Sequence, residues 1–144
     1  MIKIICVGKL KEQYLKDACL EYKKRITKYS NIEIIELKDS DISKEKDEIL
    51  KYINKKEYII TLQIEGTMIS SLELSSKLDS IYNNYSDITF IIGGSDGLHD
   101  EIKKLSNYQL SFSKLTFPHQ LFRVLLLEQI YRSFKIMNNE TYHK

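Results

Sequence analysis

The fold class is indicated most clearly by one stretch, Ile88-Thr89-Phe90-Ile91-Ile92-Gly93-Gly94-Ser95-Asp96-Gly97. Its first half is an apolar run of strand length, which is typical of a strand buried on both faces. Its second half holds three glycines, so the strand ends in a loop whose backbone can approach another group closely. The stretch therefore predicts a strand-to-loop junction of the kind that α/β proteins use for ligands.

Segments of strand and helix character alternate through the rest of the chain. The predicted strands are Lys3–Val7, Ile32–Leu37, Tyr58–Ile64, Ile88–Ile92 and Tyr108–Phe112. The predicted helices are Glu12–Tyr29, Ser43–Ile53, a helix that a Ser70–Glu73 capping box opens and that runs to about Tyr82, Leu98–Leu105, and a last helix from His119 to about Met137. This order predicts an α/β fold with a mainly parallel sheet and helices on both faces, in a single domain over residues 1–144.

The five glycines all follow predicted strands: Gly8, Gly66, Gly93, Gly94 and Gly97. Open α/β sheets bind ligands beyond the carboxyl ends of their strands. Gly8 and Gly66 are interpreted as turn residues, and the cluster of the other three as a ligand loop. Its spacing fits neither the dinucleotide fingerprint nor a P-loop, so both nucleotide interpretations are weak. A cofactor held mostly by backbone groups stays open.

The composition is that of a globular chain, with 42% apolar residues and a formal net charge of +2. No apolar run approaches the roughly 20 residues of a membrane helix, and the start of the chain is too short and strand-like for a signal peptide. Cys6 and Cys19 fit reduced core thiols, which predicts a cytoplasmic protein. His99, His119 and His143 lack metal-ligand spacing, so no metal site is predicted.

Charge is distributed unevenly along the chain. Residues 1–30 carry eight basic and three acidic side chains (+5), residues 31–107 carry nine and fifteen (−6), and residues 108–144 carry five and two (+3). If the two basic ends meet in space, they form a positive face that suits a polyanionic partner. A solvated helix face rich in lysine explains the same pattern equally well.

The last predicted helix, His119–Met137, is apolar almost all round. A surface helix ordinarily shows a single apolar stripe. A chain of 144 residues can scarcely surround a central helix on every side. The pattern therefore predicts a homodimer that packs through this helix.

Several motifs resemble the RlmH (YbeA) family of SPOUT-class methyltransferases, which act on ribosomal RNA. The matching stretches are Val7-Gly8-Lys9-Leu10-Lys11, Thr61-Leu62-Gln63-Ile64-Glu65-Gly66, Ile91-Ile92-Gly93-Gly94-Ser95-Asp96-Gly97-Leu98, Ser111-Phe112-Ser113-Lys114-Leu115-Thr116-Phe117-Pro118-His119 and Tyr142-His143-Lys144. They span nearly the whole chain. The segment between about Leu37 and Tyr58 is shorter than in the family.

The resemblance implies S-adenosylmethionine as cofactor, a trefoil-knotted C-terminal half and a homodimer. It also implies N3-methylation of a pseudouridine in 23S ribosomal RNA. By the same resemblance, the residues expected to contact the cofactor are Leu62, Gly93, Phe112, Ser113, Lys114, Leu115, Thr116 and Phe117. Leu62, Leu115 and Phe117 would offer apolar contacts to the adenine, and Gly93 would let the backbone approach the ligand.

Methyl transfer to an imide nitrogen needs alignment, loss of a proton and stabilisation of the resulting anion. The candidates for the last two roles are His143, Lys144, Arg123 and Arg132. His143 is a candidate base, although orienting the substrate is an equally good role. Tyr142 is suited to stacking on an extruded nucleotide.

Some of these residues can also be interpreted without a catalytic role. The final three residues fit a frayed terminus, and His119 fits a structural position at the start of a helix. Two other functions also fit the chain: a non-catalytic RNA-binding or assembly factor that keeps the fold, and a small-molecule-binding module.

Overall fold

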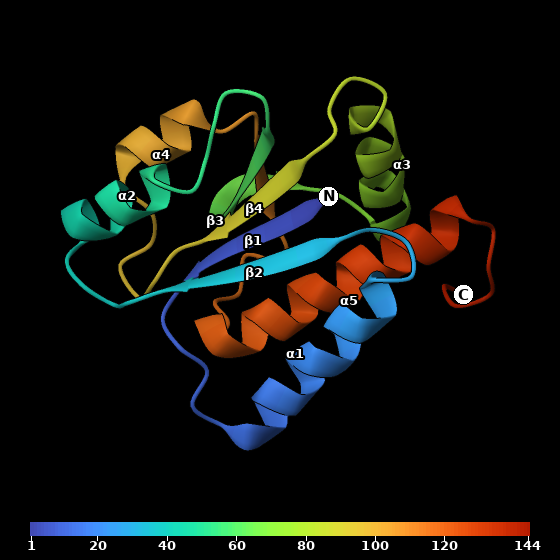
Figure 1. Ribbon diagram of the computed structural model, residues 1–144, viewed down its shortest axis with the longest axis horizontal. Coiled ribbons are helices and arrows are strands. Elements are labelled where there is room, and N and C mark those ends of the chain that lie inside the picture. The colour runs from blue at the N-terminus through green and yellow to red at the C-terminus, as the bar shows by residue number, and fades with distance from the viewer.

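The computed structural model describes residues 1–144 as alternating strands and helices (Figure 1). The strands are β1 (Ile2–Val7), β2 (Ile32–Leu37), β3 (Tyr58–Met68), β4 (Ile88–Ile92) and β5 (Tyr108–Ser111). The helices are α1 (Gln13–Ile26), α2 (Ile42–Leu50), α3 (Ser71–Ile81), α4 (Asp100–Leu105) and α5 (His119–Met137). The predicted order of elements is confirmed.

The five strands form one sheet in the order β2-β1-β4-β3-β5, and every neighbouring pair is parallel. The predicted sheet was mainly parallel, and the observed sheet is entirely so. All five residues of β4 are buried, as its continuous apolar run predicts. The glycine loop that follows β4 therefore starts from the centre of the sheet.

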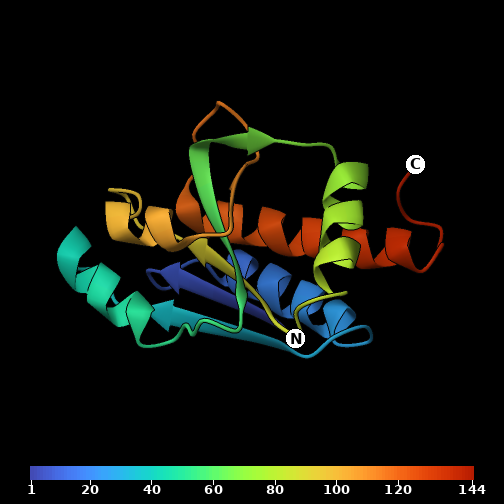
Figure 2. The same ribbon diagram turned by 90° about the horizontal axis from the view of Figure 1, so that it is seen from above.

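Helices cover both faces of the sheet, and each face has its own core. On one face α1, α3 and α5 pack around residues such as Ile4, Phe90 and Leu126. On the other face α2 and α4 enclose a smaller core that includes Ile5 and Ile91. Figures 1 and 2 show α1 and α5 side by side on the first face. Cys6 and Cys19 are free and buried in the first core, as predicted.

The connections after β1 and β4 leave the sheet toward opposite faces. β1 leads into α1 on one face, and its neighbour β4 leads into α4 on the other. In open parallel sheets a ligand site lies where neighbouring connections diverge in this way. The topology therefore predicts a ligand site at the carboxyl ends of the central strands.

The largest difference from the sequence prediction is the end of β3. The strand runs to Met68, past the predicted end at Ile64, because its pairing with β5 shifts register between Leu62 and Thr67. Gly66 thus lies inside the strand and not in a turn after it. A Cβ atom at Gly66 would lie 2.7 Å from the carbonyl oxygen of Gln109, so β5 can approach only a glycine there. Figure 2 shows the end of β3 bending before α3.

Other corrections concern helix ends. α1 stops at Ile26 instead of Tyr29. α2 is capped by Asp41, whose side chain accepts from the amide of Lys44, and ends at Leu50. α4 begins at Asp100, because the ring of His99 accepts from the amide of Glu101 and caps the helix. The predicted Ser70–Glu73 capping box is present.

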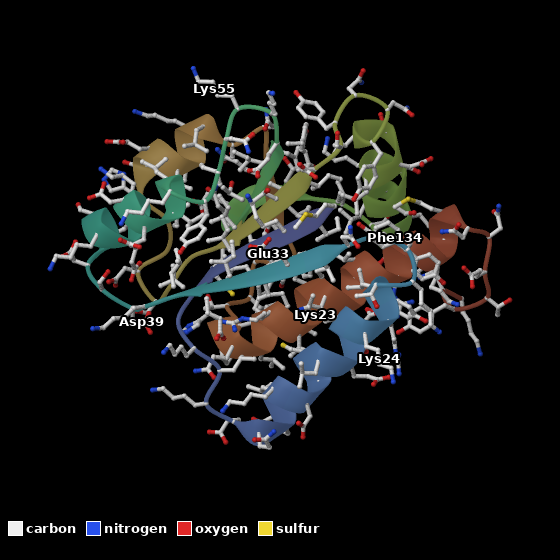
Figure 3. The ribbon with its side chains drawn as sticks, in the orientation of Figure 1. Lys23, Lys24, Glu33, Asp39, Lys55 and Phe134 are labelled. Carbon is white, nitrogen blue, oxygen red and sulfur yellow. The ribbon has the colours of Figure 1, made fainter.

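The two basic ends of the chain meet in space. Tyr29, just beyond α1, stacks on Phe134 of α5 with ring centroids 5.7 Å apart. Figure 3 shows Phe134 on α5 and the neighbouring Lys23 and Lys24 on α1.

None of the helices is both long and apolar enough to span a membrane.

Candidate functional site

The main cavity, of about 440 Å³, lies at the bend of β3 and at the carboxyl ends of β4 and β5. Most of its lining comes from three chain segments: residues 62–65 at the bend of β3, residues 92–95, 97 and 98 after β4, and residues 110–113 and 115–119 from the end of β5 to the start of α5. All three follow from the parallel order of the sheet, which brings the ends of these strands to one edge. Figure 2 shows the loop before α5 beside the bent end of β3.

The packing of its own backbone requires a glycine at the first position of the loop after β4. A Cβ atom at Gly93 would lie 2.6 Å from the carbonyl oxygen of Gly97. Gly97 has a φ of 77°, and its amide donates to the carbonyl of Gly94 at 3.0 Å, which closes a tight turn. The prediction that Gly93 admits a ligand stays a prediction. The packing of Gly93 against Gly97 already requires a glycine there.

The loop between β5 and α5 is shaped by two serines and three phenylalanines. Ser111 donates to the carbonyl of Ser113 at 3.1 Å, and the hydroxyl of Ser113 accepts from the amide of Leu115 at 2.9 Å. The rings of Phe112 and Phe117 both lie against Phe122, with centroids 4.8 and 6.3 Å away. These contacts hold the loop open around the cavity, with Leu115 71% exposed at its rim.

Most of the residues expected to contact a cofactor are brought together here. Those that line the cavity are Leu62, Gly93, Phe112, Ser113, Leu115, Thr116 and Phe117. Lys114 belongs to the same loop, but it is exposed and does not line the cavity.

Gln63, which was not among the predicted contacts, also lines the cavity. Its side chain is only 9% exposed, and its Nε2 donates to the hydroxyl of Thr61 at 2.7 Å. Its Oε1 is buried without a hydrogen-bond partner. A buried polar atom of this kind is costly unless something pairs with it. A polar residue between the apolar Leu62 and Ile64 was the available signal.

Two charged residues close one side of the cavity. Lys103 of α4 donates to the carboxylate of Glu65 on β3 at 3.0 Å. Hydrogen bonding to its own backbone amide, and then to Lys103, lowers the pKa of Glu65. The Glu65 carboxylate therefore stays ionised at neutral pH, and its hydrogen bond with Lys103 links the bend of β3 to α4.

His119 lines the cavity at the start of α5, although the sequence favoured a purely structural role. Its Nε2 lies 3.1 Å from the position that a Cβ atom of Gly8 would occupy, and Asp39 lies 3.2 Å from the same point. Gly8 has a φ of 100°, so glycine is favoured there for the backbone as well. Figure 3 shows Asp39 in the loop that follows β2.

Arg123, a predicted catalytic residue, is 1% exposed. One terminal nitrogen of its guanidinium pairs with Glu36 of β2, and the other donates to the carbonyl of Gly8 at 2.9 Å. The residue does not line the cavity. Arg123 ties α5 to the ends of β1 and β2, which makes it a support of the site. A catalytic contact by its side chain stays a prediction.

The segment 138–144, called the tail below, folds back on α5. The hydroxyl of Tyr142 donates to Glu128 at 3.2 Å, and its ring lies edge-on to Tyr131 at 4.9 Å. The guanidinium of Arg132 lies 4.7 Å from the centre of the Tyr142 ring, and one of its nitrogens lies 3.0 Å from Nδ1 of His143. The tail therefore lies against α5 and does not extend away from it. Lys144 is exposed.

Burial, and then the charge of Glu128, raises the pKa of Tyr142 to about 12. The phenol therefore stays protonated at neutral pH and can donate to Glu128. A frayed terminus would not hold these contacts, so the interpretation of the tail as a frayed chain end does not describe this structure.

The tail and the cavity lie at different places along α5. His119 and Phe122 line the cavity at the start of the helix, whereas the tail contacts Glu128 and Arg132. Nine residues of helix between His119 and Glu128 correspond to about 13 Å. Figure 1 shows the tail at the far end of α5 from the loop that precedes it. The two predicted parts of the site are therefore separate within a single chain.

Similarity to known proteins runs over the whole chain. A family model described as "Predicted SPOUT methyltransferase" matches residues 1–143. "Ribosomal RNA large subunit methyltransferase H" of Caldicellulosiruptor saccharolyticus is 49% identical over 154 residues, which cover 100% of both chains. The protein of the same name from Clostridium botulinum (strain Alaska E43) is 53% identical over 157 residues, which cover 99% of both chains.

A solved structure extends the comparison to the fold. The probable methylase family protein from Haemophilus influenzae Rd KW20 superposes with a TM-score of 0.60 at 12% identity, covering 99% of this chain and 70% of that one. At that identity the similarity concerns the fold alone.

No group of three or more His, Cys, Asp or Glu side chains is arranged to hold a metal ion.

Proposed function

The chain belongs to the SPOUT methyltransferase family, and we propose that it methylates the ribosomal RNA of the large subunit. The observation that carries this proposal is the identity of about half the residues, over the whole length, with relatives named as large-subunit ribosomal RNA methyltransferases. The non-catalytic assembly factor and the small-molecule module are not favoured, because those relatives are named as enzymes.

S-adenosylmethionine is the proposed methyl donor. The cavity volume of about 440 Å³ falls among small-molecule sites. Leu62, Leu115 and Phe117 provide apolar walls of the kind that an adenine packs against, and the glycine loop exposes backbone groups. The unpartnered Oε1 of Gln63 suits an N–H or O–H donor. When bound, this cofactor supplies a methyl group on a positively charged sulfur.

The proposed acceptor is N3 of a pseudouridine in 23S ribosomal RNA. The N3 electron pair forms the new C–N bond, the C–S bond breaks with its electrons remaining on sulfur, and the N3 proton leaves to water or a base. The protein has to align the two reactants and to stabilise the negative charge on the imide. Residues of the tail have the donors for the second task.

We propose a homodimer in which the tail of one protomer reaches the cavity of the other. The support is the separation of tail and cavity within one protomer, together with apolar side chains left on the outside of α5. Leu121, in the first turn of α5, is 40% exposed. Burying such a side chain contributes about 1.5–3 kcal/mol. A trefoil knot in the C-terminal half is likewise proposed from the family.

The test uses ribosomes from a strain that lacks this methylation. The purified protein and S-adenosylmethionine with a labelled methyl group are added, and the label in 16S and 23S RNA is counted separately. Label in 23S RNA alone supports the proposal. A protein lacking residues 142–144 should bind the cofactor with unchanged affinity and transfer far less label. No transfer by the intact protein, despite cofactor binding, overturns the proposed function.

A further inference from the structure

The contact between Arg132 and His143 determines which nitrogen of the imidazole carries the proton. Nη1 of Arg132 lies 3.0 Å from Nδ1 of His143. A guanidinium has five N–H donors and no acceptor, so Nδ1 must accept this hydrogen bond. Nδ1 therefore carries no proton, and the neutral ring carries its proton on Nε2.

Arg132 is itself held in place from two directions. Its Nε and Nη2 both lie 3.1 Å from Oε2 of Glu128. Its plane lies over the ring of Tyr142, which also donates to Glu128. With one edge of the guanidinium on Glu128, Nη1 is left to face the imidazole. The arrangement fixes the orientation of the ring as well as its tautomer.

We propose that Arg132 is a positioning residue that presents His143 to the RNA as a hydrogen-bond donor through Nε2. This inference rests on the proposed function. In this state the lone pair on Nδ1 is engaged by Arg132 and Nε2 is protonated, so neither nitrogen can take a proton from the substrate. The Nε2–H group can donate to a carbonyl oxygen of the imide, where negative charge develops as N3 loses its proton to water. The docked tail thus makes His143 an anion-stabilising donor and not a base.

The tautomer is tested by long-range ¹H–¹⁵N correlation spectra of protein labelled at its three histidines. His143→Ala identifies the signal of His143. At pH 8 the wild type should show the Nε2–H tautomer alone. Arg132→Met, which keeps the bulk and removes the donors, should give a mixture of tautomers. A wild-type ring protonated on Nδ1, or a spectrum that Arg132→Met leaves unchanged, overturns the proposal without reference to activity.

The donor role is tested by methyl transfer to ribosomes. His143→Ala should lower kcat by roughly 10²-fold, the usual cost of removing one such donor. His143→Gln offers an amide N–H in place of Nε2–H and should remain within roughly tenfold of wild type. Arg132→Lys should recover part of the rate that Arg132→Met loses. Cofactor affinity should be the same in all four variants.

The pH profile separates the donor from the base. The rate of His143→Ala should not return toward wild type between pH 7 and 9.5 if the donor role holds. A glutamine variant as inactive as the alanine variant, or rescue of His143→Ala by high pH, contradicts the proposal and identifies a base. Failure of the wild type to methylate ribosomes contradicts the proposed function instead, because the tautomer measurement stands apart from it.

Discussion

Gly93 packs against Gly97 so closely that a Cβ atom on Gly93 would lie 2.6 Å from the carbonyl oxygen of Gly97. The two residues stand at opposite ends of the loop that borders the cavity. A side chain at position 93 must therefore push backbone away from backbone. The loop that the sequence identified as a ligand loop has a shape that depends on this contact.

Gly93→Ala should lower the free energy of unfolding by about 1–3 kcal/mol, as overpacking does, and should abolish the rise in melting temperature that S-adenosylmethionine causes. Gly94→Ala is the matched control. The Cβ atom at position 94 would meet side chains of Val7 and Asp39 at 3.1 and 3.3 Å, and these can move. Calorimetric scans with and without cofactor measure both effects. Equal cofactor responses in the two variants would contradict this account of the loop.

Arg123 is buried and its ion-pair partner Glu36 is exposed, so removal of the two partners should lower the stability by different amounts. Arg123 is 1% exposed, so Glu36→Ala leaves its charge buried without a counterion, which costs about 3–5 kcal/mol. Arg123→Met fills the same space and leaves Glu36, which is partly exposed, to be hydrated. Urea unfolding of both variants should therefore rank Glu36→Ala as the less stable. The opposite ranking would show that the guanidinium reaches solvent.

Glu45 should make the protein less stable as the pH rises. Burial raises its pKa above the ordinary value of 4.5, and Asp39 and Asp96 add to the effect. The folded state therefore binds this proton more tightly than the unfolded chain does. The resulting stability is fully present below the ordinary pKa and is lost as the pH rises through the folded-state pKa.

Glu45→Gln keeps an acceptor for the amide of Ser40, 2.9 Å from the present carboxylate, and removes the charge. It should raise the free energy of unfolding at pH 7 and give no gain below about pH 4, where the carboxyl is neutral in both states. Glu48→Gln, at an exposed position paired with Lys51, is the control and should give no gain at either pH. A gain for Glu45→Gln that persists unchanged at low pH would show that charge is not its cause.

The proposed dimer is best probed at Leu121. Leu126 is fully buried within the protomer, so a charge there would unfold the chain and would not report on association. Leu121 is 40% exposed, and Leu121→Asp should give a folded monomer at micromolar concentration with little methyl transfer. Sedimentation velocity and circular dichroism measure the two properties. A wild type that sediments as a monomer at the same concentration would rule out the dimer.

Much of the fold follows from local patterns. The bounds of β2 and β4 are predicted to the residue, because each is a run rich in apolar residues and bordered by polar or glycine residues. The start of α5 at His119 is also as predicted, and its end at Met137 is close to the prediction. The end of β3 is not predictable in this way. Glu65, Gly66 and Thr67 look like a turn, and only pairing with β5 makes them part of a strand. The order of strands in the sheet likewise depends on contacts between distant segments.

Part of the candidate site also follows from local sequence patterns, and part does not. The glycine loop and the loop before α5 are visible in the sequence, because glycine, serine and proline mark strand ends there. The burial of Arg123 and the docking of the tail on Arg132 and Glu128 come from tertiary contacts that no local pattern records. A role for Gln63 in the site was not predicted, because a single polar residue in a strand has many explanations.

The central claim is that this chain transfers a methyl group to N3 of a pseudouridine in the large ribosomal RNA. The most direct measurement is mass spectrometry of nucleosides and of nuclease fragments from 23S RNA, after ribosomes lacking the modification are incubated with the protein and S-adenosylmethionine. The account predicts one N3-methylpseudouridine at a single position, and its strong reduction when residues 142–144 are deleted. A methyl group on a different base or on 16S RNA, or no methylated nucleoside at all, would contradict it.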